Sequence, residues 1–219
     1  MIFFLCLILP VFYGCHYKEG VTTDIQPGGK VILDRIAVLP FQRISPEDAS
    51  LKVAACPLCG SILRSEEFPQ DAEKSVENIF LERFAERKKL KLISPELAGA
   101  VFNRISAESL KGTMPEILKK VGYELDAEGM IVGYVYRYRE RVGFPYSVEK
   151  PASVAFEIHL VRTEDGVIVW KGIFDKTQKS LMENMFQIVS FFKGRGQWIT
   201  VNELATEGMD AILENFPGF

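Results

Sequence analysis

Residues 153–177 read SVAFEIHLVRTEDGVIVWKGIFDKT, and this stretch decides the fold. Its first half alternates in the manner of a strand that buries one face. The inward positions are Val154, Phe156, Ile158 and Leu160. Thr163–Gly166 has the polar, glycine-ending composition of a hairpin turn, after which 167–177 returns as a partner strand. The stretch therefore predicts two antiparallel strands.

The segment before this hairpin predicts a third strand, because residues 130–141 also alternate. Alternation places two sets of side chains on opposite faces of that strand. One set is Val132, Tyr134, Tyr136 and Tyr138, and the other is Ile131, Val135, Arg137 and Arg139.

Further from the hairpin, the chain predicts one buried strand and several helices. Residues 35–41, RIAVLPF, form a continuous apolar run typical of a strand buried on both faces. Helical periodicity and capping signals such as Thr113 with Glu116 predict helices over 70–88, 95–105, 114–125 and 201–216, with a short strand at 90–93. The fold class is therefore α/β, a single-domain sandwich in which helices cover a mixed sheet of about five strands.

Composition limits the partners. The 219 residues carry 26 basic and 29 acidic side chains, for a net charge of −3, with no repeats or charge blocks. A nucleic-acid-binding domain is normally strongly basic, so we expect no nucleic-acid partner.

The amino terminus predicts a lipid anchor. The apolar run from Ile2 to Tyr13 is too short to cross a membrane and suits the core of a secretory signal. Gly14 and Cys15 follow, and the chain then becomes polar, an arrangement that resembles a bacterial lipobox. The signal departs from that pattern at Phe12 and Tyr13, and no basic residue opens it. A buried amino-terminal element is the alternative.

The lipobox resemblance divides the chain into three parts. Residues 1–14 are expected to be a lipoprotein signal peptide, 15–30 a lipidated cysteine with its tether, and 31–219 a periplasmic α/β domain with a long cysteine-containing loop at 42–69. His16 after the cysteine favours the outer membrane over the inner one.

Two cysteines remain for the folded domain, Cys56 and Cys59, in the sequence Cys-Pro-Leu-Cys-Gly. Three interpretations are open. The cysteines form a local disulfide that braces the loop or stay as free thiols, they bind a metal through a dimer, or they act as a redox pair. A metal site within one chain lacks a second pair of ligands, since only His16 and His159 remain. We therefore assign no metal and no cofactor to the chain.

No catalytic set is apparent. His159 is expected on the outward face of its strand as a surface residue, and neither a Ser-His-Asp spacing nor a glycine-rich phosphate loop is present. Tyrosine and arginine are enriched at binding hot spots, and an apolar stretch follows at 181–192. The predicted partner contacts are Tyr136, Arg137, Tyr138, Arg139, Phe186, Phe191 and Phe192. A sheet face partly under a helix is the alternative for the first four.

Three segments carry a family resemblance: Arg35–Phe41, the DGVIVWKG segment at 165–172, and the terminal helix. Together with the order of elements, they resemble the superfamily of periplasmic domains that includes the TolB amino-terminal domain, the curli secretion lipoprotein and the lipoprotein activators of penicillin-binding proteins. The resemblance implies a TolB-like fold and an envelope location, but no catalytic residues.

The sequence thus predicts a non-enzymatic envelope lipoprotein that binds a protein partner or serves as an assembly subunit. The alternatives are an oligomeric secretion-channel component resembling the curli pore and, third, a thiol-redox enzyme acting through Cys56 and Cys59. Homo-oligomerisation is compatible with an assembly subunit and with a secretion-channel component.

Overall fold

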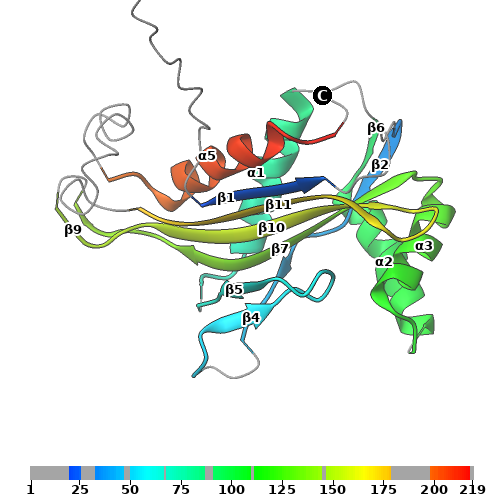
Figure 1. Cartoon of the computed structure of the whole chain (residues 1–219), viewed down its shortest axis with the longest axis horizontal. Helices are drawn as coiled ribbons and strands as arrows, with labels where there is room; N and C mark the ends of the chain where they lie inside the picture. Colours follow the sequence, from blue (N-terminus) through cyan, green and yellow to red (C-terminus); the bar gives the residue numbers. More distant parts are fainter. Residues whose placement is uncertain are drawn as a thin grey trace, which may run out of the picture.

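A computed structural model describes residues 20–25, 33–46, 50–66, 68–86, 91–109, 111–144, 147–178 and 198–217. They form one α/β domain around a mixed seven-stranded sheet (Figure 1). The strand order is β1-β11-β10-β7-β2-β6, and β3 also pairs with β7. The α/β class is confirmed, whereas the predicted count of about five strands was too low.

Three long antiparallel strands form the middle of the sheet: β7 (Gly129–Arg139), β10 (Ser153–Arg162) and β11 (Ile168–Thr177). β10 pairs with β7 on one side and with β11 on the other. The turn between β10 and β11 uses Gly166, whose φ of +76° lies in the left-handed region that glycine tolerates. All three strands follow the predicted segments closely.

Parallel strands extend the sheet beyond β7. β2 (Arg35–Val38) lies between β7 and β6 (Lys91–Ile93), and β3 (Gln42–Arg43) continues along β7. Parallel neighbours need crossover connections, which α1 and the α2–α3 pair provide. The helices α1 (Ala72–Glu86), α2 (Pro95–Glu108), α3 (Met114–Leu125) and α5 (Val201–Leu213) correspond to the four predicted ones.

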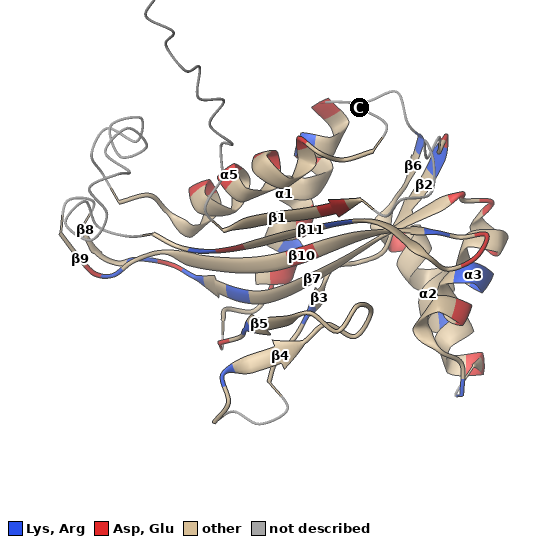
Figure 2. Cartoon of the chain, in the orientation of Figure 1, with Lys and Arg blue, Asp and Glu red and all other residues tan. Residues whose placement is uncertain are grey.

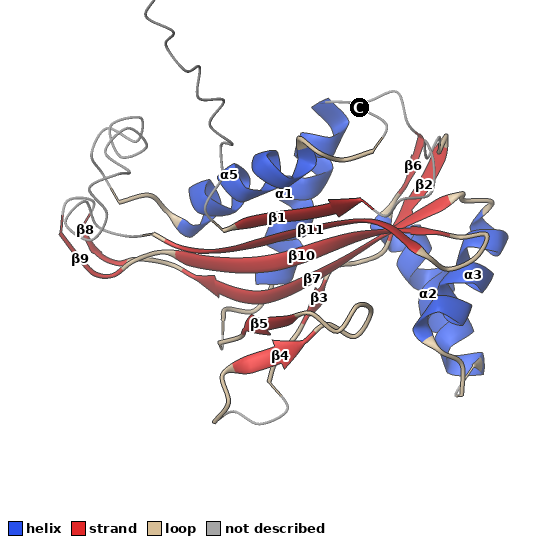
Figure 3. Ribbon diagram, viewed as in Figure 1, coloured by secondary structure: helices blue, strands red, loops and turns tan. Residues whose placement is uncertain are grey.

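The two faces of the sheet have different covers (Figure 3). On one face, α1 and α5 pack over Val154, Phe156, Ile158 and Leu160 of β10, the residues predicted to point inward. On the other face, α2 and α3 cover one end. Beside them, the hairpin of β4 (Val53–Ala55) and β5 (Ile62–Arg64), residues 53–64, packs on β7 and β10, and we call it the β4–β5 lobe.

The β4–β5 lobe lies inside the loop predicted at 42–69, so that segment has strands of its own. The segment 15–30, expected to be a tether, contains β1 (Val21–Ile25), which pairs antiparallel with β11 along the edge of the sheet. A second small hairpin, β8 (Val142–Phe144) with β9 (Ser147–Lys150), continues from the end of β7.

A β-bulge in β7 changes which side chains share a face. The register with β10 shifts so that Arg137 lies opposite Ala155 and Val135 lies opposite Phe156, which leaves Tyr136 as the extra residue. Beyond a bulge the alternation is offset by one position. Tyr138 consequently packs into the core under α1 and α5, whereas Tyr134 and Tyr136 lie on the opposite face, contrary to the strict alternation predicted from the sequence.

Figure 2 shows basic and acidic positions on the same helices of the described part of the chain. Acidic and basic side chains are mixed on α1, α2 and α3, while the charged residues of α5 are all acidic. Among the described residues, no helix has the length and apolar character needed to cross a membrane.

Candidate functional site

The turn of the β4–β5 lobe is built by the Cys-Pro-Leu-Cys-Gly segment. Cys56 donates its backbone N–H to the Ser61 carbonyl at 2.7 Å, and the Gly60 N–H closes the turn on the Cys56 carbonyl at 3.0 Å. Gly60 has a φ of +75°, a conformation that favours glycine. The Cys56 Sγ accepts two backbone N–H groups, from Leu58 and Cys59, each at 3.4 Å. The turn therefore directs two backbone N–H donors at the sulfur of Cys56.

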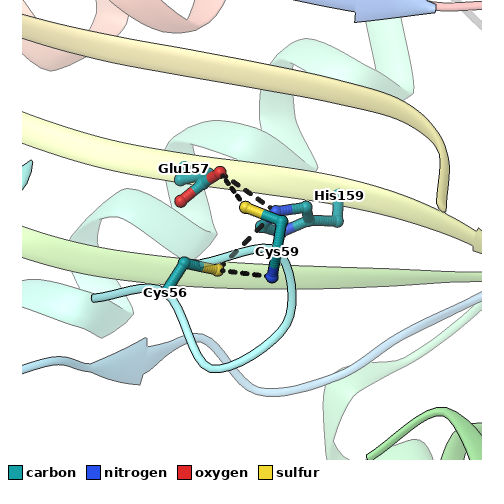
Figure 4. A group of neighbouring side chains, drawn as sticks. All are labelled: Cys56, Cys59, Glu157 and His159. Atoms are coloured by element: carbon teal, nitrogen blue, oxygen red, sulfur yellow. Dashed lines mark hydrogen bonds and ion pairs between the residues drawn. The ribbon is translucent and has the colours of Figure 1, made fainter. Parts of the chain in front are cut away.

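The sheet contributes Glu157 and His159 of β10 to the same place. They are two residues apart, so their side chains leave the strand on one face, the face that the β4–β5 lobe covers. Both are fully buried, with 0% of their surface exposed. Figure 4 shows the two side chains directed toward the cysteines of the turn.

The four side chains contact one another closely. His159 Nε2 lies 3.1 Å from Glu157 Oε1 and 3.8 Å from Cys56 Sγ. Cys59 Sγ lies 3.0 Å from the same carboxylate oxygen. One donor atom from each of the four residues falls within 4.8 Å of all the others. We call Cys56, Cys59, Glu157 and His159 the Cys-Glu-His cluster.

Neighbouring hydroxyls orient the glutamate. Tyr136 donates to Glu157 Oε2 at 3.2 Å, and Ser61 donates to Oε1 at 3.1 Å. Burial raises the pKa of Tyr136, and Cys56 and Glu157 raise it further, so the phenol stays protonated and acts as a donor. Oε2 is thus held by Tyr136, while Oε1 faces the imidazole and the Cys59 thiol.

The electrostatics of the cluster are those of a buried ion pair. Burial lowers the pKa of His159, but its hydrogen bonds to Cys56, Cys59 and Glu157 outweigh burial and raise that pKa to about 11. Burial likewise raises the pKa of Glu157, but the hydrogen bond and charge of His159 lower it to about 2.

The Cys59 thiol is also perturbed. Burial raises its pKa, and the hydrogen bonds to His159 and Ser61 more than offset this, so the net shift is downward. A thiol with a lowered pKa more readily forms the thiolate, which is the form that reacts and that binds metals.

The structure changes what the sequence indicated for these residues. Both cysteines are free thiols in the structure, and the disulfide remains a prediction. His159, expected at the surface, is completely buried, because the β4–β5 lobe covers the face that lies outward along β10. The ligand-type residues that the sequence lacked near the cysteines come from β10, about a hundred residues away. Glu157 was missed, although its spacing of two from His159 on a strand is the signal that places both on one face.

Three predicted partner contacts lie in the interior. Tyr136, Arg137 and Tyr138 are buried, and their polar atoms bond within the chain. Arg139 is partly exposed and pairs with Glu66 at 2.7 Å. The three buried side chains are therefore not available at the surface, because the β4–β5 lobe and α3 pack on one face of β7 and α1 packs on the other. The predicted anchor Cys15 and the contacts Phe186, Phe191 and Phe192 lie outside the described residues.

Comparison with known proteins identifies the fold. No protein-family model and no curated protein matches the sequence. The solved structure of the PelC dodecamer from Paraburkholderia phytofirmans matches with a TM-score of 0.52 and 12% sequence identity, over 91% of this chain and 99% of that chain. The match shows that the two chains share a fold.

Two further solved structures are similar at lower scores. Lipoprotein GNA1162 from Neisseria meningitidis matches with a TM-score of 0.40 and 12% identity, covering 74% of this chain and 98% of that one. The LpoB carboxy-terminal domain from Escherichia coli matches with a TM-score of 0.36 and 12% identity, covering 69% and 88%. The resemblance predicted from the sequence is thus confirmed for the fold alone, through the match to PelC.

Proposed function

We propose that this protein is a lipid-anchored, non-enzymatic assembly subunit of the bacterial cell envelope, and that it associates with further copies of itself. The observation that carries the proposal is the fold shared with PelC, which is described as a dodecamer and is matched along nearly its whole length. Binding a different envelope protein is the alternative outcome.

The β8–β9 hairpin supports self-association. It extends beyond the end of the sheet, away from α2 and α3 (Figure 1). Two apolar side chains are exposed on it, Phe144 at 77% and Val142 at 47%. Aromatic side chains are enriched at the centres of interfaces because they bury a large area at a small entropic cost. We therefore place the contact between copies at this hairpin.

We expect Phe144→Asp to shift the full-length, detergent-extracted protein to a smaller assembly, measured by sedimentation velocity and mass photometry. A charge placed in a desolvated contact loses hydration without gaining a partner. Tyr123→Asp is the matched control, since Tyr123 is 91% exposed on α3 at the other end of the domain.

The control is expected to sediment as the wild type does. A monomeric wild type would contradict self-association, and equal behaviour of the two variants would remove the hairpin from the contact. In-cell crosslinking of the same variants distinguishes a copy of this chain from another envelope protein as the partner.

The anchor has its own test. One acyl chain binds a membrane only marginally, at about 0.8 kcal/mol per buried methylene, and two or more chains make attachment stable. We expect metabolic labelling with a radioactive fatty acid to mark the wild type, and Cys15→Ser to lose the label and leave the membrane fraction. Cys56→Ser serves as the control and should keep the label. Label that survives in Cys15→Ser would contradict the assignment.

A further inference from the structure

We propose that the Cys-Glu-His cluster binds one Zn²⁺ ion, which fastens the β4–β5 lobe to the central sheet. The proposal rests on the geometry of the four side chains and does not depend on the proposed self-association. The turn of the lobe supplies Cys56 and Cys59, and β10 supplies Glu157 and His159.

The donor atoms match the preferences of zinc. Structural zinc sites use four ligands drawn from thiolate sulfur, imidazole nitrogen and carboxylate oxygen in a tetrahedral arrangement. Two sulfurs, one nitrogen and one oxygen converge here from four different side chains. Thiolates favour zinc over magnesium or calcium, which prefer oxygen ligands alone.

The distances are close to those of a tetrahedral site. Bond lengths of about 2.0–2.3 Å imply ligand–ligand separations of roughly 3.3–3.8 Å in a tetrahedron. The observed separations are 3.8 Å for Cys56 Sγ to His159 Nε2, 3.1 Å for His159 Nε2 to Glu157 Oε1, and 3.0 Å for Cys59 Sγ to Glu157 Oε1. The remaining separations are all within 4.8 Å, so small side-chain movements would place the four atoms around a common centre.

The backbone of the turn is arranged for a bound thiolate. The N–H groups of Leu58 and Cys59 both donate to Cys56 Sγ, and donors directed at a sulfur stabilise its negative charge. The two-residue spacing lets both sulfurs face one point, as Cys-x-x-Cys zinc ligands do.

A second layer of hydrogen bonds fixes the carboxylate. Tyr136 holds Oε2 of Glu157 and Ser61 contacts Oε1, so one oxygen is directed at the cysteines. Such outer partners orient ligands in metal sites. On binding, the two thiols and His159 Nε2 release their protons to solvent, because only the deprotonated groups coordinate.

The role we assign to the ion is structural. Four protein ligands complete a tetrahedral shell and leave no open position for substrate. Cys56, Glu157 and His159 are at most 4% exposed. The ion would join segments about a hundred residues apart, and it would hold the lobe over a sheet face that otherwise presents a glutamate and a histidine to water.

The test uses the full-length protein, purified in detergent without chelators from cells grown with zinc. Elemental analysis should give one zinc per chain. Replacement by Co²⁺ should give the visible absorption of a tetrahedral thiolate site. Digestion with trypsin releases both cysteines in one peptide, residues 53–64. Alkylation of the denatured protein without reductant should label both cysteines in that peptide.

The variants separate binding from folding. We expect Cys59→Ser and Glu157→Gln to reduce zinc affinity by about tenfold or more, since each removes an anionic ligand. Cys59 is partly exposed, so its replacement is the variant expected to stay folded by circular dichroism. Glu66→Gln is the matched control: it lies just past the lobe, pairs with Arg139, and should bind zinc as the wild type does.

Three outcomes would overturn the proposal: reduced wild-type protein that takes up no zinc, peptide 53–64 recovered with a disulfide from protein that was never exposed to oxidant after lysis, or full zinc retention by folded Cys59→Ser. The second outcome would establish the cysteines as a local disulfide, and the first would leave a hydrogen-bonded cluster of free thiols.

Discussion

Replacement of Trp170 by alanine is expected to lower the free energy of unfolding by about 3–5 kcal/mol, the range for removing a large aromatic side chain from a packed interior. Trp170 of β11 is 0% exposed and meets Phe216 edge-on, with ring centroids 4.8 Å apart. Its ring also lies over Gly172, where a Cβ would come within 2.7 Å of it. The close fit on both sides means that alanine leaves a cavity.

Chemical denaturation followed by circular dichroism measures this change. Among the described residues the indole Nε1 has no hydrogen-bond partner, so Trp170→Phe removes volume alone and should cost clearly less than Trp170→Ala. Tyr123→Ala is the control, because its side chain is 91% exposed and its loss should change stability by no more than about 0.5 kcal/mol. Equal effects of Trp170→Ala and Tyr123→Ala would show that the α5 face of the sheet is not the core described above.

Sequence patterns predicted the elements whose stability is local. The helix expected at 114–125 is α3, because Glu116 caps it through the Thr113 N–H at 2.8 Å and its apolar stripe is buried. The strand expected at 153–162 is β10, because every second side chain enters a core. Periodicity and capping are read from neighbouring residues, so one sequence suffices for them.

Elements stabilised by distant partners were not predicted. β1 is a five-residue strand with mostly exposed side chains, and it is held by its pairing with β11. The lobe strands β4 and β5 have three residues each. Short strands of this kind carry little periodicity, and their stability comes from the sheet or face that they meet.

The candidate site could not be predicted for the same reason: it is formed by residues that are distant in the sequence. The Cys-x-x-Cys spacing was visible, but its partners lie on β10, and only the fold of the lobe brings them to Cys56 and Cys59. When the lobe is left out of account, the alternation of β10 predicts that His159 lies on the side of the strand exposed to solvent. The bulge at Tyr136 could not be predicted from the sequence either, because an extra residue in β7 becomes apparent only when the pairing of β7 with β10 is known.

Replacement of Arg137 by methionine is expected to destabilise the domain by about 3 kcal/mol. Arg137 is 3% exposed, and its guanidinium donates to Ser153 Oγ at 2.6 Å and to the Arg64 carbonyl at 3.2 Å. It also forms an ion pair with Asp175. Breaking a buried pair costs about 3–5 kcal/mol because the remaining charge is uncompensated. The Asp175 side chain is 36% exposed and can regain some hydration, which places the effect at the lower end.

Arg139→Met provides the matched comparison on the same strand. The Arg139–Glu66 pair is about one-third exposed on both sides, and pairs near the surface contribute about 0–1 kcal/mol. The difference between the two variants therefore measures burial, since the substitution is identical.

The position of Arg137 also predicts a local effect on the β4–β5 lobe. Through the Arg64 carbonyl it holds the carboxy-terminal end of the β4–β5 lobe, whereas the Cys-Glu-His cluster holds the turn at the opposite end. Amide hydrogen exchange over residues 53–64 should accelerate in Arg137→Met and stay unchanged in Arg139→Met. If exchange accelerates only near Arg64 and the turn keeps its protection, the cluster is an independent attachment. If the whole lobe exchanges at once, the two attachments act as one cooperative unit, and the lobe is an integral layer of the domain.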